Sequence, residues 1–289
     1  MHKPYSIAIL ADIHGILHSL EAVLAEIQSN SPDEILVAGD FLGGPQPREV
    51  LARLQSLGCR FILGNGEVNM LKMRQGTAPS EWWTHRQFDM GRWIYRRLDE
   101  AVFDFLAGLS EQLVIAQDGS APFRVVHGSP WDVNTLIFPD QNPQDLTRAL
   151  GMMSEGLLVF AHNHLPGIFP RAGKLALNPG SVSNNLNGDR RATYATLTWT
   201  GECWLPELHY VAYDLAPVVA VFKETGFLRE NRPLARAFLE SILTAENTAL
   251  DYIVFARERA QAAGFDGFTA IPDEVWLGLE ASFPWQYDF

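Results

Sequence analysis

Short apolar runs with β-strand character alternate with helical stretches through roughly the first 200 residues of this 289-residue chain, and each run ends in a polar cluster. The first elements show the pattern. Residues 6–11 are predicted to form a buried strand, residues 17–28 an amphipathic helix and residues 34–38 the next strand. This alternation predicts a layered α/β fold, in which helices cover the faces of a sheet.

The alternation continues with a predicted helix at 47–57, a strand at 60–63 and a long helical region at 81–109. Further strands are expected at 114–116, 123–126, 157–160, 175–177 and 194–199. Short connections between the later strands suit hairpins better than crossovers. We therefore expect parallel pairing to dominate the first half of the sheet structure and antiparallel pairing the second.

The pattern changes after Pro217. Helices are predicted at 218–226, 232–243 and 247–263, and an aromatic tail ends the chain at Phe289. We expect two parts, an α/β domain at 1–217 and a helical C-terminal extension at 218–289 packed on it.

Composition excludes several classes of partner. The formal net charge of −12 opposes stable nucleic-acid binding and attachment to an anionic membrane. It does not exclude association of the chain into a homo-oligomer. Cys59 and Cys203 are too few for a disulfide framework, which favours a reducing, cytoplasmic setting. The chain has no signal-peptide core and no run of about 18 apolar residues, so we expect neither secretion nor membrane insertion.

Polar clusters follow the predicted strands, where open α/β sheets bind ligands. They are Asp12-Ile13-His14-Gly15, Gly39-Asp40, Gly64-Asn65-Gly66-Glu67, His127-Gly128-Ser129-Pro130 and His162-Asn163-His164. Residues two apart in an extended segment project to the same side, so the paired ligands of the first and last clusters can converge. Carboxylate, imidazole and amide donors together suit Mn, Fe, Ni, Co or Zn, and this many donors fit two ions better than one.

The order of these clusters resembles the calcineurin-like metallophosphoesterase superfamily, whose pattern is D-x-H, G-D, G-N-H-[DE], a later H and G-H-x-H. The resemblance covers about residues 5–215. It is strongest to the bacterial branch of small phosphodiesterase-like proteins, through LHSLEAVLAEI, GDFLGGPQPREVL, VHGSP and LNPGSVS. It implies a four-layer α/β/β/α sandwich, here followed by the C-terminal helical extension.

The resemblance also implies a role for each donor. One metal would be bound by Asp12, His14 and His164, the other by Asn65, His127 and His162, and Asp40 would bridge both. Among these seven residues, we expect Asp40, Asn65 and His127 to act in catalysis as well.

Two positions depart from the family pattern. Gly66 replaces the histidine usually assigned to leaving-group protonation or phosphate binding, which leaves the general acid open. The neighbouring Glu67 could orient a water or accept hydrogen bonds from the local backbone, and we favour the second role. Ala161 and Asn163, beside the H-x-H histidines, are not usual ligands and are expected to be tolerated.

The donor set predicts phosphoryl chemistry. Two divalent ions, less the charges of Asp12, Asp40 and a bridging hydroxide, leave about +1 to bind a phosphate anion. We expect in-line attack by a metal-bridging hydroxide on phosphodiester or phosphoanhydride bonds of small, nucleotide-like molecules, with manganese as the first candidate metal. Without the histidine, substrates with acidic leaving groups should be favoured. The alternative is a non-catalytic scaffold of the same fold for protein interaction, supported by Gly66 and the additional helices.

Other segments allow two interpretations. Residues 81–97 interleave three tryptophans with basic residues, as in a lid over a base or phosphate, or as in an amphipathic helix with buried rings. The Gly43-Gly44-Pro45-Gln46-Pro47 and Asn178-Pro179-Gly180-Ser181 stretches are either parts of the site or ordinary turns.

Overall fold

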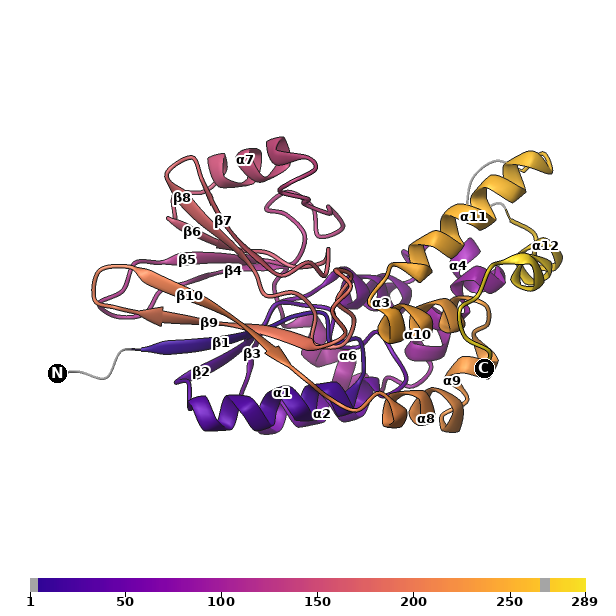
Figure 1. The fold of residues 1–289 in the computed structure, drawn as a ribbon, viewed down its shortest axis with the longest axis horizontal. Helices are drawn as coiled ribbons and strands as arrows, with labels where there is room; N and C mark the ends of the chain where they lie inside the picture. Colours follow the sequence, from indigo (N-terminus) through magenta and orange to yellow (C-terminus); the bar gives the residue numbers. More distant parts are fainter. Residues whose placement is uncertain (1–4, 266–270) are drawn as a thin grey trace.

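Two five-stranded sheets pack face to face in the computed structural model, which describes residues 5–265 and 271–289 (Figure 1). The other residues of the two predicted parts, 1–4 and 266–270, lie outside the described residues. The first sheet has the order β10-β9-β1-β2-β3 and consists of β1 (Ser6–Leu10), β2 (Glu34–Val37), β3 (Arg60–Phe61), β9 (Ala192–Trp199) and β10 (Trp204–Val211). The second has the order β4-β5-β6-β8-β7 and consists of β4 (Gln112–Ile115), β5 (Phe123–Val126), β6 (Leu157–Val159), β7 (Gly167–Arg171) and β8 (Lys174–Asn178).

The pairing confirms that parallel pairs dominate the first half and antiparallel pairs the second, where β4 pairs with β5 and β7 with β8 in antiparallel orientation. Strands β1, β2 and β3 pair in parallel as expected, and β9 and β10 are antiparallel. However, β5 pairs with β6, and β6 with β8, in parallel. Helix α7 (Pro143–Gly151), which was not predicted from the sequence, supplies the crossover between β5 and β6. Between β6 and β8 the chain passes through β7, which pairs with β8 in antiparallel orientation.

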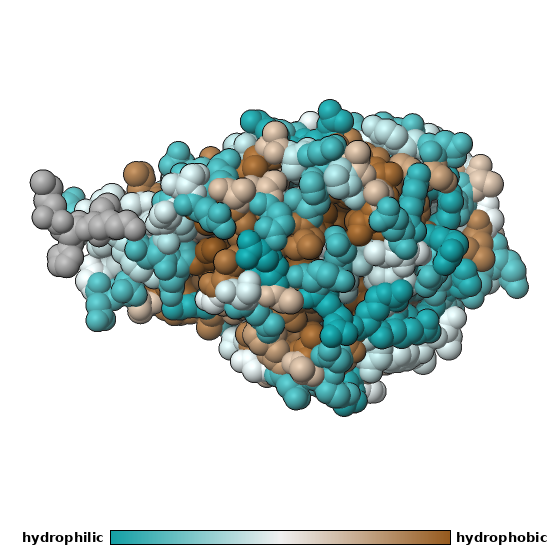
Figure 2. Space-filling view, turned by 90° about the horizontal axis from the view of Figure 1, so that it is seen from below, coloured by the Kyte–Doolittle hydropathy of each residue, from teal (hydrophilic) through white to brown (hydrophobic). Residues whose placement is uncertain are grey.

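Helices cover both outer faces, so the layers run α, β, β, α as expected (Figure 1). The amphipathic helices α1 (Leu17–Asn30) and α2 (Pro47–Ser56) cover the first sheet, and α7 covers the second. Apolar side chains from both sheets, including Ile9, Val125 and Leu197, are fully buried between them. Figure 2 shows the face that α1 and α2 turn to solvent, where hydrophilic residues separate smaller hydrophobic patches.

Short helices replace the single helical region expected at 81–109. After α3 (Asn65–Gln75) the chain forms α4 (Glu81–Thr84), a 3-10 turn (Arg86–Phe88), α5 (Asp89–Tyr95) and α6 (Glu100–Ala107). The region is interrupted at His85, which is extended, and at Asp99, whose carboxylate caps α6 by accepting a hydrogen bond from the Val102 amide.

The C-terminal residues form α8 (Ala216–Glu224), α9 (Phe227–Glu230), α10 (Leu234–Thr244), α11 (Thr248–Ala262), α12 (Asp273–Leu279) and a 3-10 turn (Glu280–Ser282). Phe222 and Phe238 belong to the same apolar cluster as Leu20 of α1, and Phe227 packs edge-to-face on Trp93 of α5, with ring centres 4.9 Å apart. The division into two domains at residue 217 stays a prediction, since one core spans it. None of the helices in the described part of the chain is long and apolar enough to cross a membrane.

Candidate metal centre

The predicted ligands meet where strands of the two sheets end. Asp12 and His14 follow β1, Asp40 follows β2, and Asn65 begins α3 just after β3. The remaining histidines follow β5 and β6 of the other sheet. Because β1, β2 and β3 are parallel, and β5 and β6 are parallel, each sheet delivers its polar residues at one edge.

Two groups of candidate metal ligands result. In the first, ligand atoms of Asp12, His14 and His164 lie within 4.8 Å of one another, and the Nε2 atoms of the two histidines are 3.1 Å apart. In the second, Asp40, His127 and His162 satisfy the same limit.

Asn65 joins the second group, because its Oδ1 lies 3.1 Å from His127 Nε2. Asp12 links the two groups, since its Oδ2 accepts a hydrogen bond from the His162 amide. All seven residues predicted from the sequence are therefore neighbours.

The backbone is strained at these positions. In the described part of the chain, eight residues other than glycine have positive φ, and five of them are candidate ligands: Asp12, His14, Asp40, His162 and His164. Left-handed backbone is uncommon outside glycine, although Asp and His tolerate it better than most residues. Such clustering is typical of functional sites, where the surrounding structure maintains the strain.

The hydrogen bonds of two histidines fix which ring nitrogen faces the centre. His127 Nδ1 lies 2.8 Å from the Ala38 carbonyl and His164 Nδ1 lies 2.7 Å from the Asn184 carbonyl. Because a carbonyl only accepts, each Nδ1 carries a proton and donates it. In the neutral rings each Nε2 then presents a lone pair to the centre, the orientation that metal-binding histidines have.

Lone pairs converge on one carboxylate oxygen. Asp12 Oδ1 is buried, accepts no well-formed hydrogen bond from the described residues, and has His164 Nε2 at 3.2 Å and His14 Nε2 at 3.7 Å. With neutral rings this arrangement is repulsive, and a divalent cation would turn it into coordination. The residues present therefore fit a metal.

Burial and charge divide the histidines into two kinds. Burial and the adjacent His164 lower the pKa of His14 to about 4, and burial and His127 lower the pKa of His162, so both rings are neutral at neutral pH. Burial also opposes charge on His127 and His164. There, however, carboxylates outweigh it: Asp40 and Asp12 raise the pKa of His127, and Asp12 raises that of His164.

Glu67 has the role that we favoured, as an acceptor for the backbone. Its fully buried carboxylate accepts hydrogen bonds of 2.8–3.0 Å from the amides of Asp40, Phe41, Leu42 and Gly64. Burial and Asp40 raise the pKa of Glu67 to about 7, whereas the amide donors oppose that rise. Glu67 thus holds the turn that presents Asp40.

The loop after β8 supports the centre from the other side, which shows that the Asn178-Pro179-Gly180-Ser181 stretch is near the site. The Ser181 hydroxyl donates to the Asp12 carbonyl at 2.7 Å, and Ser183 donates to the same oxygen at 3.3 Å. The Asn184 carbonyl orients His164. No sequence pattern singled out Ser183 or Asn184 as supporting residues, because their bonding partners lie about 170 and 20 residues away along the chain.

Small and amide residues pack around the ligands. A Cβ on Gly43 would lie 2.4 Å from His14 Nδ1, and one on Gly44 would lie 2.0 Å from the His14 carbonyl oxygen, so these glycines are needed for close approach to His14. The buried Asn163 side chain is hydrogen-bonded to other protein groups. It donates to the Ile137 carbonyl and accepts from the Leu165 amide, which fixes the turn between His162 and His164.

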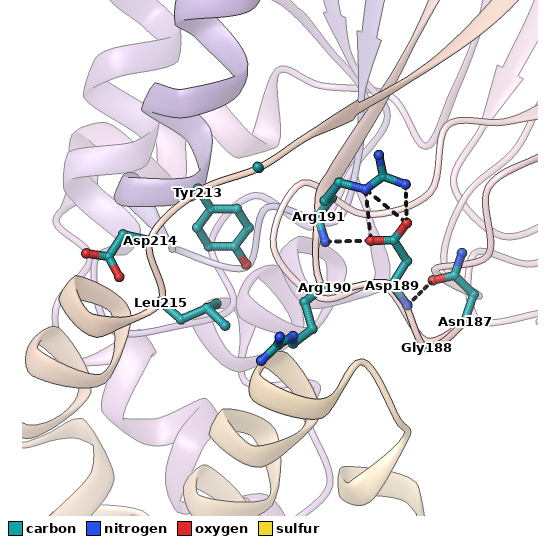
Figure 3. Close-up of a pocket in the computed structure, with 9 residues that line it drawn as sticks. Asn187, Gly188, Asp189, Arg190, Arg191, Tyr213, Asp214 and Leu215 are labelled. Carbon is teal, nitrogen blue, oxygen red and sulfur yellow. Dashed lines mark hydrogen bonds and ion pairs between the residues drawn. The ribbon is translucent and has the colours of Figure 1, made fainter.

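Two other regions contribute none of the candidate metal ligands. Trp93 is buried, Trp82 packs on the core, and Trp83 is 42% exposed but packs edge-on against Tyr95. Only Met90 of residues 81–97 lines the cavity beside the candidate ligands, which favours the packing interpretation over a lid. A second hollow, shown in Figure 3, lies between the loop before β9 and the loop after β10. There Asp189 pairs with Arg191 while Arg190 extends away from them.

Comparison with known proteins shows which family this chain matches. The model of the calcineurin-like phosphoesterase superfamily domain matches residues 5–202. An uncharacterized protein of Methanocaldococcus jannaschii is 25% identical over 209 residues, which cover 65% of this chain and 80% of that protein. The symmetrical bis(5'-nucleosyl)-tetraphosphatase of Erwinia tasmaniensis is 35% identical over 77 residues, only 25% of this chain and 28% of that enzyme.

Solved structures show the same fold. A metallophosphoesterase from Sphaerobacter thermophilus has a TM-score of 0.67 at 23% identity, covering 83% of this chain and 99% of its own. A hypothetical protein from Pyrococcus horikoshii has a TM-score of 0.69 at 20% identity, covering 81% and 97%.

Replacing Glu67 by Gln should weaken metal binding. The Gln amide nitrogen would face backbone donors that the carboxylate accepts, so the Asp40 turn loosens and manganese affinity falls by about 10- to 100-fold. Isothermal titration calorimetry of the folded variant measures this, with exposed Glu224→Gln as the control. An affinity equal to that of Glu224→Gln would contradict the positioning role.

Manganese binding should release protons and strengthen as pH rises. The carboxylates keep His127 and His164 protonated to higher pH, and a metal binds only the unprotonated nitrogen, so protons compete with it. Affinity should therefore increase between about pH 6 and pH 8. Calorimetry in two buffers of different ionisation enthalpy measures the protons released, and a pH-independent affinity without proton release would exclude these two ligands.

Proposed function

The chain belongs to the calcineurin-like phosphoesterase superfamily, and on that premise we propose that it hydrolyses phosphodiester or phosphoanhydride bonds in small, nucleotide-like molecules. Family membership makes it a phosphoric ester hydrolase. The observation that carries the proposal is the convergence of two groups of buried ligands, each with one carboxylate and two imidazoles, at the edge shared by the sheets.

Two divalent cations are the proposed cofactors. Asp12, His14 and His164 would hold one, Asn65, His127 and His162 the other, and Asp40 both. When bound, two such cations supply an activated water for in-line attack and neutralise charge on the phosphoryl oxygens. Manganese is our first candidate, with Fe, Ni, Co and Zn as alternatives, since the donors are mixed oxygen and nitrogen.

The protein's own part is to hold these ligands rigidly. Glu67 holds the Asp40 turn, and the Gly66 amide donates a hydrogen bond of 2.8 Å to Asp40 Oδ1. The Ala38 carbonyl fixes the His127 ring. Ligands oriented in this way need little rearrangement during the reaction, which is the usual source of electrostatic catalysis.

Gly66 bears on the choice of substrate. It stands where the family pattern has a histidine, and it offers no proton to a leaving group. Esters whose leaving groups are already acidic need little protonation, so aryl diesters and phosphoanhydrides should react faster than alkyl monoesters. The nucleotide hydrolase from Erwinia tasmaniensis supports the phosphoanhydride class, over the short segment that matches.

The two free cysteines support the proposed reducing, cytoplasmic setting, since Cys203 is an exposed thiol. The alternative of a non-catalytic scaffold predicts a folded protein with neither bound metal nor manganese-stimulated turnover.

Manganese-loaded protein should hydrolyse bis(p-nitrophenyl) phosphate much faster than an alkyl phosphomonoester.

Gly66→His should then increase turnover of the alkyl ester, by up to about 100-fold, because an imidazole can protonate a poor leaving group. Gly66→Ala is the matched control, since any Cβ there would lie 3.1 Å from Asp40 Oδ1 and displace it slightly. A wild-type preference for the alkyl monoester would contradict the proposed specificity.

A further inference from the structure

A cavity of about 720 Å³ opens beside the candidate metal centre. One end is polar and is formed by five of the predicted ligands: His14, Asp40, Asn65, His162 and His164. A phosphate bound by the proposed cations would lie at this end, so the rest of the cavity faces the groups esterified to that phosphate.

The rest of the cavity is mostly apolar, and much of it comes from the C-terminal extension. Helix α10 contributes Leu234 and Phe238, and α11 contributes Leu250 and Ile253. The Phe238 ring packs edge-on against His14, with centres 5.7 Å apart, so the apolar lining begins directly at a ligand.

The loop between β5 and α7 forms further lining with Leu136 and Phe138, and α5 adds Met90. Leu136 is 41% exposed and Leu250 is 48% exposed. Large apolar side chains left in water around a concave site typically contact a ligand.

The charge of the residues that line the cavity limits how many negative charges a bound phosphate group can carry. None of the described residues that line the cavity is Lys or Arg, and Asp40 is its carboxylate. A phosphodiester brings one negative charge, whereas a monoester brings up to about two and a bridging tetraphosphate about four. Two cations that are partly neutralised by Asp12 and Asp40 can balance the single charge of a phosphodiester. The outer phosphates of a polyphosphate, in contrast, would lie unpaired against apolar side chains.

We infer that this cavity binds a phosphodiester monoanion through an apolar ester substituent, and that α10 and α11 determine this specificity. This inference rests on the proposed function and narrows its substrate range. The polar end holds the phosphate, while Ile253, Leu250 and Phe238 cover the substituent. An aryl group and an alkyl chain share this chemistry, and both are small enough for the cavity.

Equilibrium binding tests the inference without relying on turnover. Isothermal titration calorimetry of the manganese-loaded protein should give a dissociation constant for diphenyl phosphate at least about tenfold below that for dimethyl phosphate, because the phenyl groups bury apolar surface. Dihexyl phosphate separates the two sources of an apolar group: tighter binding than diphenyl phosphate supports an alkyl substituent, and weaker binding supports an aryl one.

Neighbouring residues on α11 provide a matched pair of variants. Ile253 lines the cavity, whereas Val254 is 44% exposed and does not line it. Ile253→Ser should reduce the preference for diphenyl over dimethyl phosphate several-fold, and Val254→Ser should retain it.

Equal dissociation constants for the two diesters, or tighter binding of a dinucleoside tetraphosphate than of diphenyl phosphate, would overturn the inference. Failure of the proposed function has a different signature. Diphenyl phosphate would still bind with the Ile253-dependent preference, but bis(p-nitrophenyl) phosphate would not be hydrolysed.

Discussion

Two buried carboxylates and four imidazole rings share one small volume between the ends of two sheets, and this concentration of lone pairs is the constraint that organises the rest of the structure. Burying such groups without compensation is costly. The backbone compensates part of the cost. The Gly66 amide donates to Asp40 Oδ1 and the His162 amide donates to Asp12 Oδ2. The carbonyls of Ala38 and Asn184 accept from the Nδ1 atoms of His127 and His164. The atom whose burial is not compensated by a hydrogen bond from the described residues is Asp12 Oδ1, which lies where a cation would fit.

Several features could be predicted because they are local. The strand at Phe123–Val126 and the βαβ opening follow from apolar periodicity, and the ligand types follow from the clusters at strand ends. The order of the clusters identified the family, which the family model then showed for residues 5–202. The ligand set itself is still a proposal, although its members are neighbours in space.

Other features could not be predicted because their causes are tertiary. Helix α7 is only nine residues long, and its apolar positions Leu146, Ala149 and Leu150 are too few to distinguish it from a loop. The left-handed backbone at His14 and Asp40 depends on contacts with Gly43, Gly44 and Glu67 from other segments. The C-terminal helices could be recognised as helices, but no pattern indicated that they reach the cavity beside the ligands, since residues 234 and 14 are brought together only by folding.

The central claim is that this chain binds two metal ions at the shared edge of its sheets. Anomalous diffraction at the manganese absorption edge, from crystals of the manganese-loaded protein, tests it most directly. We expect two peaks, one among Asp12, His14 and His164 and one among Asn65, His127 and His162, with Asp40 between them. A folded protein without a peak at either position would contradict the account.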